Sequence, residues 1–227
     1  GADVHSVQYQ NANNSVRLSD EFMKAVEQDE EWELTARIDG TVISRCSARA
    51  LFRQIAQAAW ECADPGIQFS STINQWHTAA NTGPISASNP CSEYLHLDNS
   101  ACNLASLNLL KFLEAGENDR FDLEGFCHAV RVVFTAQDIL VGNADYPTEA
   151  IGETSRDFRQ LGLGYTNLGA MLMALGLPYD SEDARAWTGA VTALMGGQAY
   201  STSVDLARRV GAFSGYASNS EPMQQVL

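Results

Sequence analysis

Five consecutive residues, Asn89-Pro90-Cys91-Ser92-Glu93, place an amide, a thiol and a carboxylate in one short stretch of the chain. A proline disfavours the helical region for the residue before it, so we expect Asn89 to be extended. In an extended backbone, side chains two apart share a face, which would align Asn89, Cys91 and Glu93. The sequence therefore predicts a chemical site on one face of this segment.

A thiol beside a carboxylate favours one kind of chemistry over another. A neighbouring negative charge disfavours the thiolate form, because like charges repel. Cys91 is better suited to giving up and taking back a hydrogen atom while Glu93 accepts a proton. The alternative is a cysteine hydrolase in which His77 or His96 activates Cys91. We favour it less, because the local sequence matches no known nucleophile setting.

A second thiol, Cys102, follows Cys91 by eleven residues. If Asp98-Asn99 forms the centre of a hairpin turn, Cys102 would lie opposite Leu95, on the face that carries Cys91 and Glu93. A slip of one residue in register would move it to the other face. Cys102 is thus a second candidate site residue, with a buried structural thiol as the alternative.

The remaining cysteines and the charge balance limit the classes of function. Cys46, Cys62 and Cys127 lie on helix or strand patterns and are expected to be buried structural thiols. An odd number of widely spaced cysteines indicates a reducing compartment such as the cytoplasm. No Cys-x-x-Cys occurs and the histidines are scattered, so no metal site is expected. A net charge of -14 argues against nucleic-acid and anionic-membrane partners.

The chain of 227 residues has 45% hydrophobic and 19% charged residues, which is typical of a globular protein. Neither a transmembrane run nor a signal peptide is evident in the sequence. Helices are expected over residues 20–29, 47–63, 122–142, 161–175 and 181–210, the last bent or interrupted near Gly196-Gly197. Strands are expected around Asp39-Gly40 within residues 32–43, and over residues 67–73. Residues 1–15 and 78–88 are expected to be loops. This order predicts an α/β fold, with a single partial domain over residues 1–227.

Three further features have structural interpretations. Gly162, Gly164 and Gly169 lack the spacing of a dinucleotide-binding loop, so they are expected to allow close helix packing. The acidic run from Glu27 to Glu33 is expected to form a solvated surface. Core positions on helical faces are expected for Met171, Met173 and Met195.

Two stretches of the chain carry a resemblance to a known family. Asn89-Pro90-Cys91-Ser92-Glu93 and residues 100–109, Ser-Ala-Cys-Asn-Leu-Ala-Ser-Leu-Asn-Leu, resemble ribonucleotide reductases, and most closely the adenosylcobalamin-dependent class II enzymes. Residues 10–17, 63–69 and 158–165 agree with the same family. The resemblance extends over nearly the whole chain.

The resemblance implies a fold, an activity and residue roles. The fold would be part of a ten-stranded α/β barrel with a central finger loop and a helix-rich C-terminal half. The activity would be reduction of ribonucleotides, expected to be diphosphates, to 2′-deoxyribonucleotides. By matching positions, Cys91 would be the thiyl radical that removes the 3′ hydrogen, and Glu93 would take the 3′-hydroxyl proton. Asn89 would hold the substrate hydroxyls, and Cys102 would be one of two reducing cysteines that close to a disulfide.

The resemblance also implies partners and gives reason to expect a piece of a longer reductase. Adenosylcobalamin would be the cofactor, a ribonucleotide the substrate, nucleotides the effectors and a thioredoxin-like protein the reductant. In the family, the second reducing cysteine precedes this region, and the phosphate loop follows it. We therefore expect a central fragment with little turnover alone, with a homodimer or a complementary fragment as possible partners. The alternatives are a non-catalytic assembly module, or an enzyme whose radical comes from a tyrosyl-radical subunit.

Overall fold

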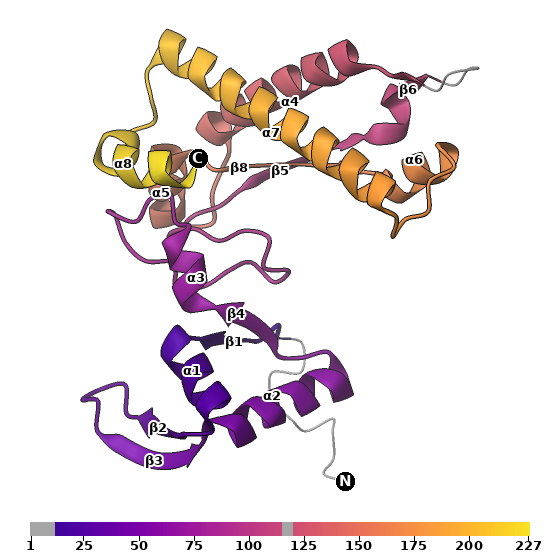
Figure 1. The fold of residues 1–227 in the computed structure, drawn as a ribbon. Helices are drawn as coiled ribbons and strands as arrows, with labels where there is room; N and C mark the ends of the chain where they lie inside the picture. Colours follow the sequence, from indigo (N-terminus) through magenta and orange to yellow (C-terminus); the bar gives the residue numbers. More distant parts are fainter. Residues whose placement is uncertain (1–11, 115–119) are drawn as a thin grey trace. The chain divides into compact units, whose positions relative to one another are not determined.

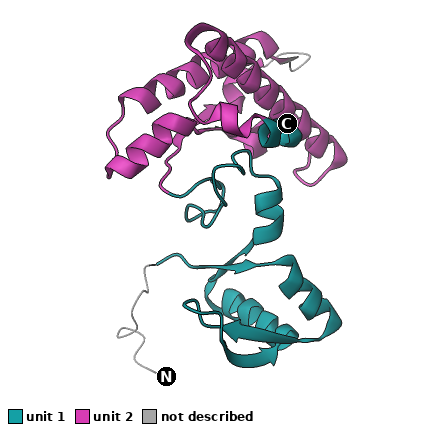
Figure 2. Cartoon of the chain, turned by 90° about the vertical axis from the view of Figure 1, so that its left-hand side faces the viewer, with its two compact units in different colours: residues 1–98, 221–227 teal, residues 99–220 magenta. Residues whose placement is uncertain are grey.

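The computed structural model describes residues 12–114 and 120–227. The chain divides into two compact units, which Figure 2 distinguishes by colour: unit 1 is residues 1–98 with 221–227, and unit 2 is residues 99–220. Each unit is described by itself below. The single partial domain over residues 1–227 stays a prediction, and residues 1–11 of the predicted N-terminal loop lie outside the described residues.

Unit 1 is built from two strand pairs and three helices (Figure 1). Its elements are β1 (Ser15–Leu18), α1 (Asp20–Gln28), β2 (Glu31–Thr35), β3 (Val42–Ser47), α2 (Ala48–Cys62), β4 (Gly66–Phe69) and α3 (Ser70–Gln75). β2 and β3 form an antiparallel hairpin, as predicted. β1 and β4 pair in parallel, with Arg17 opposite Gln68. Parallel strands need a long crossover, and α1, the hairpin and α2 provide it.

Capping residues explain where the first two helices begin and end. Ser19 accepts a hydrogen bond from the Phe22 amide at the start of α1, and Ser47 accepts one from the Ala50 amide at the start of α2. Both helices end at a residue in the left-handed region, Asp29 or Ala63, as helices commonly do. These helices confirm the two predictions for this part of the chain. The small core between them comprises Leu18, Phe22, Ala25, Ala48 and Ile55.

Unit 2 is a parallel strand pair covered by long helices (Figure 1). Its elements are β5 (Asn103–Asn108), the 3-10 helix η2 (Leu109–Phe112), β6 (Leu113–Glu114), β7 (Arg120–Phe121), α4 (Leu123–Asn143), α5 (Glu149–Phe158), β8 (Leu161–Thr166), α6 (Leu168–Ala174) and α7 (Glu182–Val210). α4 packs against β5 and β8 and also against α7. The buried core comprises Leu107, Leu109, Phe121, Phe126, Val130, Met171, Val191 and Met195. A last helix, α8 (Tyr216–Val226), is divided between the two units.

The structure corrects several predicted elements. Residues 161–166 form strand β8 and not the start of a helix, because they pair in register with β5. The strand predicted over residues 67–73 ends at Phe69, where α3 begins. Helices α3, α5 and α8 were not predicted. α7 is an uninterrupted helix through Gly196 and Gly197, so the predicted interruption is wrong.

Burial confirms some predicted positions and corrects others. Met171 and Met195 are buried, as predicted, but Met173 is 75% exposed because it lies on the outer face of α6. Cys62 is exposed and not buried, because it lies at the C-terminal end of α2. The acidic run is solvated as predicted, with Glu27, Asp29, Glu30, Glu31 and Glu33 all exposed.

None of the described helices combines the length and apolarity that crossing a membrane requires. Within the same residues, no group of three or more His, Cys, Asp or Glu side chains is arranged to hold a metal ion.

We predict that Phe126 is a main source of stability in unit 2. Phe126 is fully buried, and its ring makes edge contacts with Phe112 and Phe121 at centroid distances of 5.2 and 5.3 Å. Phe126→Ala should lower the free energy of unfolding by about 3–5 kcal/mol in urea titration, because it leaves a cavity. The matched control is Leu123→Ala, on an exposed position of α4, which should change it by less than about 0.5 kcal/mol. Equal losses in the two variants would contradict the assigned core.

Candidate functional site

The Asn89 motif forms a tight turn in unit 1 and not an extended segment. The Ser92 amide donates to the Asn89 carbonyl oxygen at 3.1 Å, which closes a four-residue turn with Pro90 and Cys91 at its centre. Ser92 has a φ of 62°, in the left-handed region. The prediction that Asn89, Cys91 and Glu93 share a face of an extended segment is therefore wrong, because the chain reverses within the motif.

Asn89 shapes the loop that carries the reactive residues. Its side-chain Oδ1 accepts a hydrogen bond from the Tyr94 amide at 3.0 Å, and its own amide donates to the Tyr94 carbonyl at 3.3 Å. These bonds close residues 89–94 into a compact loop. The Nδ2 amino group is the part of Asn89 that can still reach a ligand.

The loop presents its thiol and carboxylate outward from unit 1. Cys91 and Glu93 are exposed, whereas Ser92 between them is half-buried. An exposed thiol at the tip of a turn can meet a reactant, and a carboxylate two residues away can accept a proton from the same reactant. The backbone of the motif differs from the prediction, and its predicted chemistry stays a prediction with which the exposure of both side chains is compatible.

A pair of histidines lies in the same unit, close to Tyr94. The His77 and His96 rings meet edge to face at 5.3 Å, and Tyr94 stacks on His96 at 6.3 Å. His77 is buried; its Nε2 donates to the Gly83 carbonyl at 3.0 Å, and its Nδ1 accepts from the Ala79 amide. Both ring nitrogens of His77 are therefore engaged by backbone, which argues against His77 as a base for Cys91.

The same environment keeps both histidines neutral. Burial first, and the neighbouring His77 second, together lower the pKa of His96 from 6.5 to about 4. Burial also lowers the pKa of His77, partly opposed by the hydrogen bond to Gly83.

Cys102 lies in unit 2, immediately before β5, where the two strands approach closely. Gly162 on β8 pairs with Leu104, and a methyl group at Gly162 would come within 2.9 Å of the Cys102 Sγ. The absence of a side chain at Gly162 therefore makes room for the thiol. Close packing was predicted for this glycine, but between helices and not between strands.

The residues on either side of Cys102 are held by buried polar groups. The Ala101 amide donates to the Ser155 Oγ at 3.0 Å, and Ser155 is 1% exposed. On the other side, the Asn103 Nδ2 donates to the Gln137 carbonyl, and the Gln137 Nε2 donates to the Asn103 carbonyl, both at 3.1 Å. No sequence pattern pointed to Gln137 or Ser155, because both come from helices distant in sequence.

The predicted hairpin around Asp98-Asn99 is not formed. Residues 94–97 are not a strand, and β5 pairs in parallel with β8 because that register brings the small Gly162 against Leu104 and Cys102. Cys91 belongs to unit 1 and Cys102 to unit 2. All five cysteines are free thiols.

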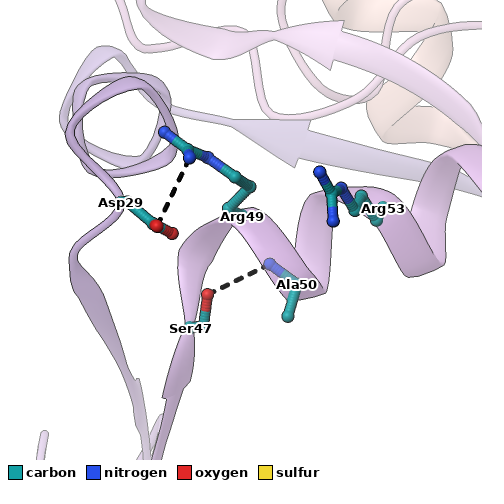
Figure 3. A pocket seen from close by; sticks show the side chains of 5 residues that line it. All are labelled: Asp29, Ser47, Arg49, Ala50 and Arg53. Carbon is teal, nitrogen blue, oxygen red and sulfur yellow. Dashed lines mark hydrogen bonds and ion pairs between the residues drawn. The ribbon is translucent and has the colours of Figure 1, made fainter.

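A separate hollow of about 400 Å³ lies where α1 ends and α2 begins (Figure 3). It is lined by Asp29, Ser47, Arg49, Ala50 and Arg53. Arg49 forms an ion pair with Asp29 at 3.3 Å and donates to the carbonyls of Val26 and Glu27. Arg49 therefore stabilises the end of α1, and none of the predicted site residues lines this hollow.

Comparison with known proteins identifies the family. Residues 2–227 match the model of the family described as ribonucleotide reductase, barrel domain. The chain belongs to this family, which confirms the resemblance carried by the Asn89 motif. Among the described residues the strands form four two-stranded sheets, so the ten-stranded closure stays a prediction.

Named relatives agree with this assignment. The chain is 58% identical over its whole length to a vitamin B12-dependent ribonucleotide reductase of Streptomyces clavuligerus and 50% identical to one of Rhodopirellula baltica. It is 35% identical, over 90% of its length, to a vitamin B12-dependent ribonucleoside-diphosphate reductase of Mycobacterium tuberculosis. The chain covers 24%, 22% and 29% of these three proteins, so it spans about a quarter of their length.

The histidine pair predicts a pH-dependent stability. Where the folded pKa lies below the unfolded pKa, the unfolded chain binds more protons, so the free energy of unfolding falls as pH falls. For His96 this loss should run from about pH 6.5 to about pH 4. His96→Phe keeps an aromatic ring against Tyr94 and should flatten this part of the profile, measured by urea unfolding. The exposed His128 gives the control, since His128→Gln should leave the slope unchanged. An unchanged slope in His96→Phe would contradict the assignment.

The close approach of β5 and β8 predicts a specific effect of Gly162→Ala. The added methyl group must displace Cys102 and Leu104, which should cost about 1–3 kcal/mol of stability and change the rate at which iodoacetamide alkylates Cys102. Gly164→Ala is the matched control, because its methyl group would meet only the Ser106 Oγ at an ordinary 3.9 Å. Equal effects of the two substitutions on the alkylation rate of Cys102 would contradict the claim that Gly162 makes room for this thiol.

Proposed function

We propose that this chain carries the radical-cysteine loop of an adenosylcobalamin-dependent reductase that converts ribonucleotides, at the diphosphate level, to 2′-deoxyribonucleotides. The observation that carries the proposal is the turn at residues 89–92, which presents Cys91 outward with Glu93 two residues away. The barrel family of the chain and the names of its relatives support the same activity. The diphosphate level is supported by the name of the Mycobacterium tuberculosis relative.

In this proposal Cys91 and Glu93 act on the same ribose, Cys91 at its C3′ hydrogen and Glu93 at its 3′-hydroxyl. The thiyl form of Cys91 takes the hydrogen atom from C3′ of the ribose and becomes a thiol. Glu93 accepts the proton of the 3′-hydroxyl, and the 2′-hydroxyl takes a proton from one of the two reducing thiols and leaves as water. The exposure of both side chains leaves them accessible to a nucleotide. The Nδ2 group of Asn89 donates a hydrogen bond to a substrate hydroxyl, since its Oδ1 is engaged by Tyr94.

Cys102 supplies one half of the reducing equivalents. Two thiols together give two electrons and two protons, and their sulfur atoms join as a disulfide. The partner of Cys102 is a cysteine outside this chain, in the remaining part of the reductase. A thioredoxin-like protein then returns the pair to thiols. The proposal also includes nucleotide effectors. A second copy of the chain or a complementary fragment is the proposed assembly partner, and the cytoplasm is the proposed location.

Adenosylcobalamin is the proposed source of the radical, as the vitamin B12 dependence in the names of the relatives supports. When bound, it supplies the radical that removes the hydrogen atom from the Cys91 thiol. The exposed position of Cys91 fits this role, because a radical formed outside the chain can reach it. None of the contacts in the described residues assigns a side chain to the corrin ring. If the full-length protein fails to bind adenosylcobalamin at equilibrium, a tyrosyl-radical subunit becomes the better source.

Substitutions in the full-length reductase that carries this chain test the proposal. Cys91→Ser should abolish formation of deoxynucleotide, and Glu93→Gln should lower kcat by about 10²–10⁴-fold because the general base is lost. Cys62→Ser is the control, since Cys62 is also exposed but lies on α2, and its activity should be unchanged. Activity that survives Cys91→Ser would contradict the radical role and favour a non-catalytic assembly module. Sustained turnover by this chain alone would contradict the need for a second part.

A further inference from the structure

A line of polar side chains connects the β1–β4 strand pair to the turn that carries Cys91. Gln68 on β4 is 5% exposed, and its Nε2 lies 2.5 Å from the Ser88 Oγ and 3.3 Å from the Ser92 Oγ. The two serine hydroxyls are 3.2 Å apart. The Ser88 hydroxyl donates to the Asn89 carbonyl at 2.8 Å. These four residues, with Arg17, are called the turn clamp below.

The hydrogens in the turn clamp can all be assigned without conflict. The Gln68 amino group has two hydrogens, one for the Ser88 oxygen and one for the Ser92 oxygen. The Ser92 hydroxyl can then donate to Ser88, whose own hydrogen goes to the Asn89 carbonyl. That carbonyl also accepts the Ser92 amide, so both of its lone pairs are used. Every hydrogen therefore has an acceptor, and the Gln68 amino group donates to both serines of the turn clamp.

Arg17 fixes the orientation of the Gln68 amide. Its Nη1 donates to the Gln68 Oε1 at 2.7 Å, so the amide of Gln68 must point its amino group towards the serines. The guanidinium is itself held by the Ser70 Oγ and the Ile85 carbonyl. Arg17 and Gln68 are directly paired in the β1–β4 register, which makes the base of the clamp part of regular structure. A hydrogen bond from a charged donor is stronger than a neutral one.

The turn needs such support because of the backbone at Ser92. A φ of 62° is costly for a residue with a side chain, by about 1–2 kcal/mol. Ser92 separates Cys91 from Glu93, so its backbone angles set the relative directions of the thiol and the carboxylate. Relaxation of Ser92 to the ordinary region would redirect both side chains.

We infer that Arg17, Gln68 and Ser88 are positioning residues that hold Ser92 in the left-handed conformation and thereby orient Cys91 and Glu93 towards one substrate. The inference rests on the proposed function for the identity of the reaction. The claim that Gln68 stabilises the conformation of the turn does not depend on that function.

The test is Gln68→Met in the full-length protein, which keeps the volume of the side chain but removes its hydrogen bonds. Hydrogen exchange of the Ser92 and Tyr94 amides should become about 10- to 100-fold faster, because a charge-assisted chain of bonds is lost. In the reductase assay kcat should fall by a comparable factor while KM changes less than about twofold, since the loss lies in orientation. Gln57→Met, at an exposed position of α2, should leave the exchange rates and kcat unchanged.

A double-mutant cycle separates positioning from general destabilisation. Glycine adopts a positive φ without strain, so Gln68→Met should accelerate amide exchange in this loop much less in a Ser92→Gly background. Ser88→Ala should also accelerate exchange of the Ser92 and Tyr94 amides, but by a smaller factor. This variant tests the inference if Gln68→Met does not fold. Unchanged exchange of the Ser92 and Tyr94 amides in both variants, or equal effects of Gln68→Met in the two backgrounds, would overturn the inference. Because exchange is measured without substrate, this outcome is distinct from failure of the proposed reaction.

Discussion

The candidate site depends on one backbone constraint, the left-handed conformation of Ser92 between a thiol and a carboxylate. A reversal of the chain within five residues allows Cys91 to stand at the tip of a turn while Glu93 follows on the returning arm. An ordinary extended backbone would place both side chains on a flat segment with fewer restraints. The cost of the unusual angle is met by a closed turn, by Asn89 binding back to Tyr94, and by buried polar contacts from β4.

The second thiol is positioned by a different physical means. Cys102 has no strained backbone of its own; it lies in a space that exists because Gly162 lacks a side chain. Buried side chains from α4 and α5 hold the residues before and after it. In the proposed mechanism Cys102 later forms a disulfide, and the parallel register of β5 and β8 gives it a defined starting position.

Residue types indicated a candidate chemistry for the site, but the local sequence pattern did not predict its geometry. The thiol and carboxylate of the Asn89 motif could be singled out because their proposed roles follow from side-chain chemistry and from the family resemblance. The turn could not be predicted from the sequence, because serine rarely adopts a positive φ. Gly or Asn at this position would have indicated one. Capped helices such as α1 and α2 were predicted well because Ser19 and Ser47 act locally. β8 was mistaken for a helix because its pairing with β5 depends on residues about sixty positions away.

In the proposed mechanism the two site cysteines have different redox roles: Cys91 carries a hydrogen atom and Cys102 supplies electrons. The most direct measurement is to let the reduced full-length reductase complete a single turnover without external reductant, and then to map its thiols by alkylation and mass spectrometry. The account predicts that Cys102 is found in a disulfide and that Cys91 is recovered as an alkylated thiol. Recovery of Cys91 in the disulfide, or turnover with Cys102 still alkylated as a thiol, would contradict it.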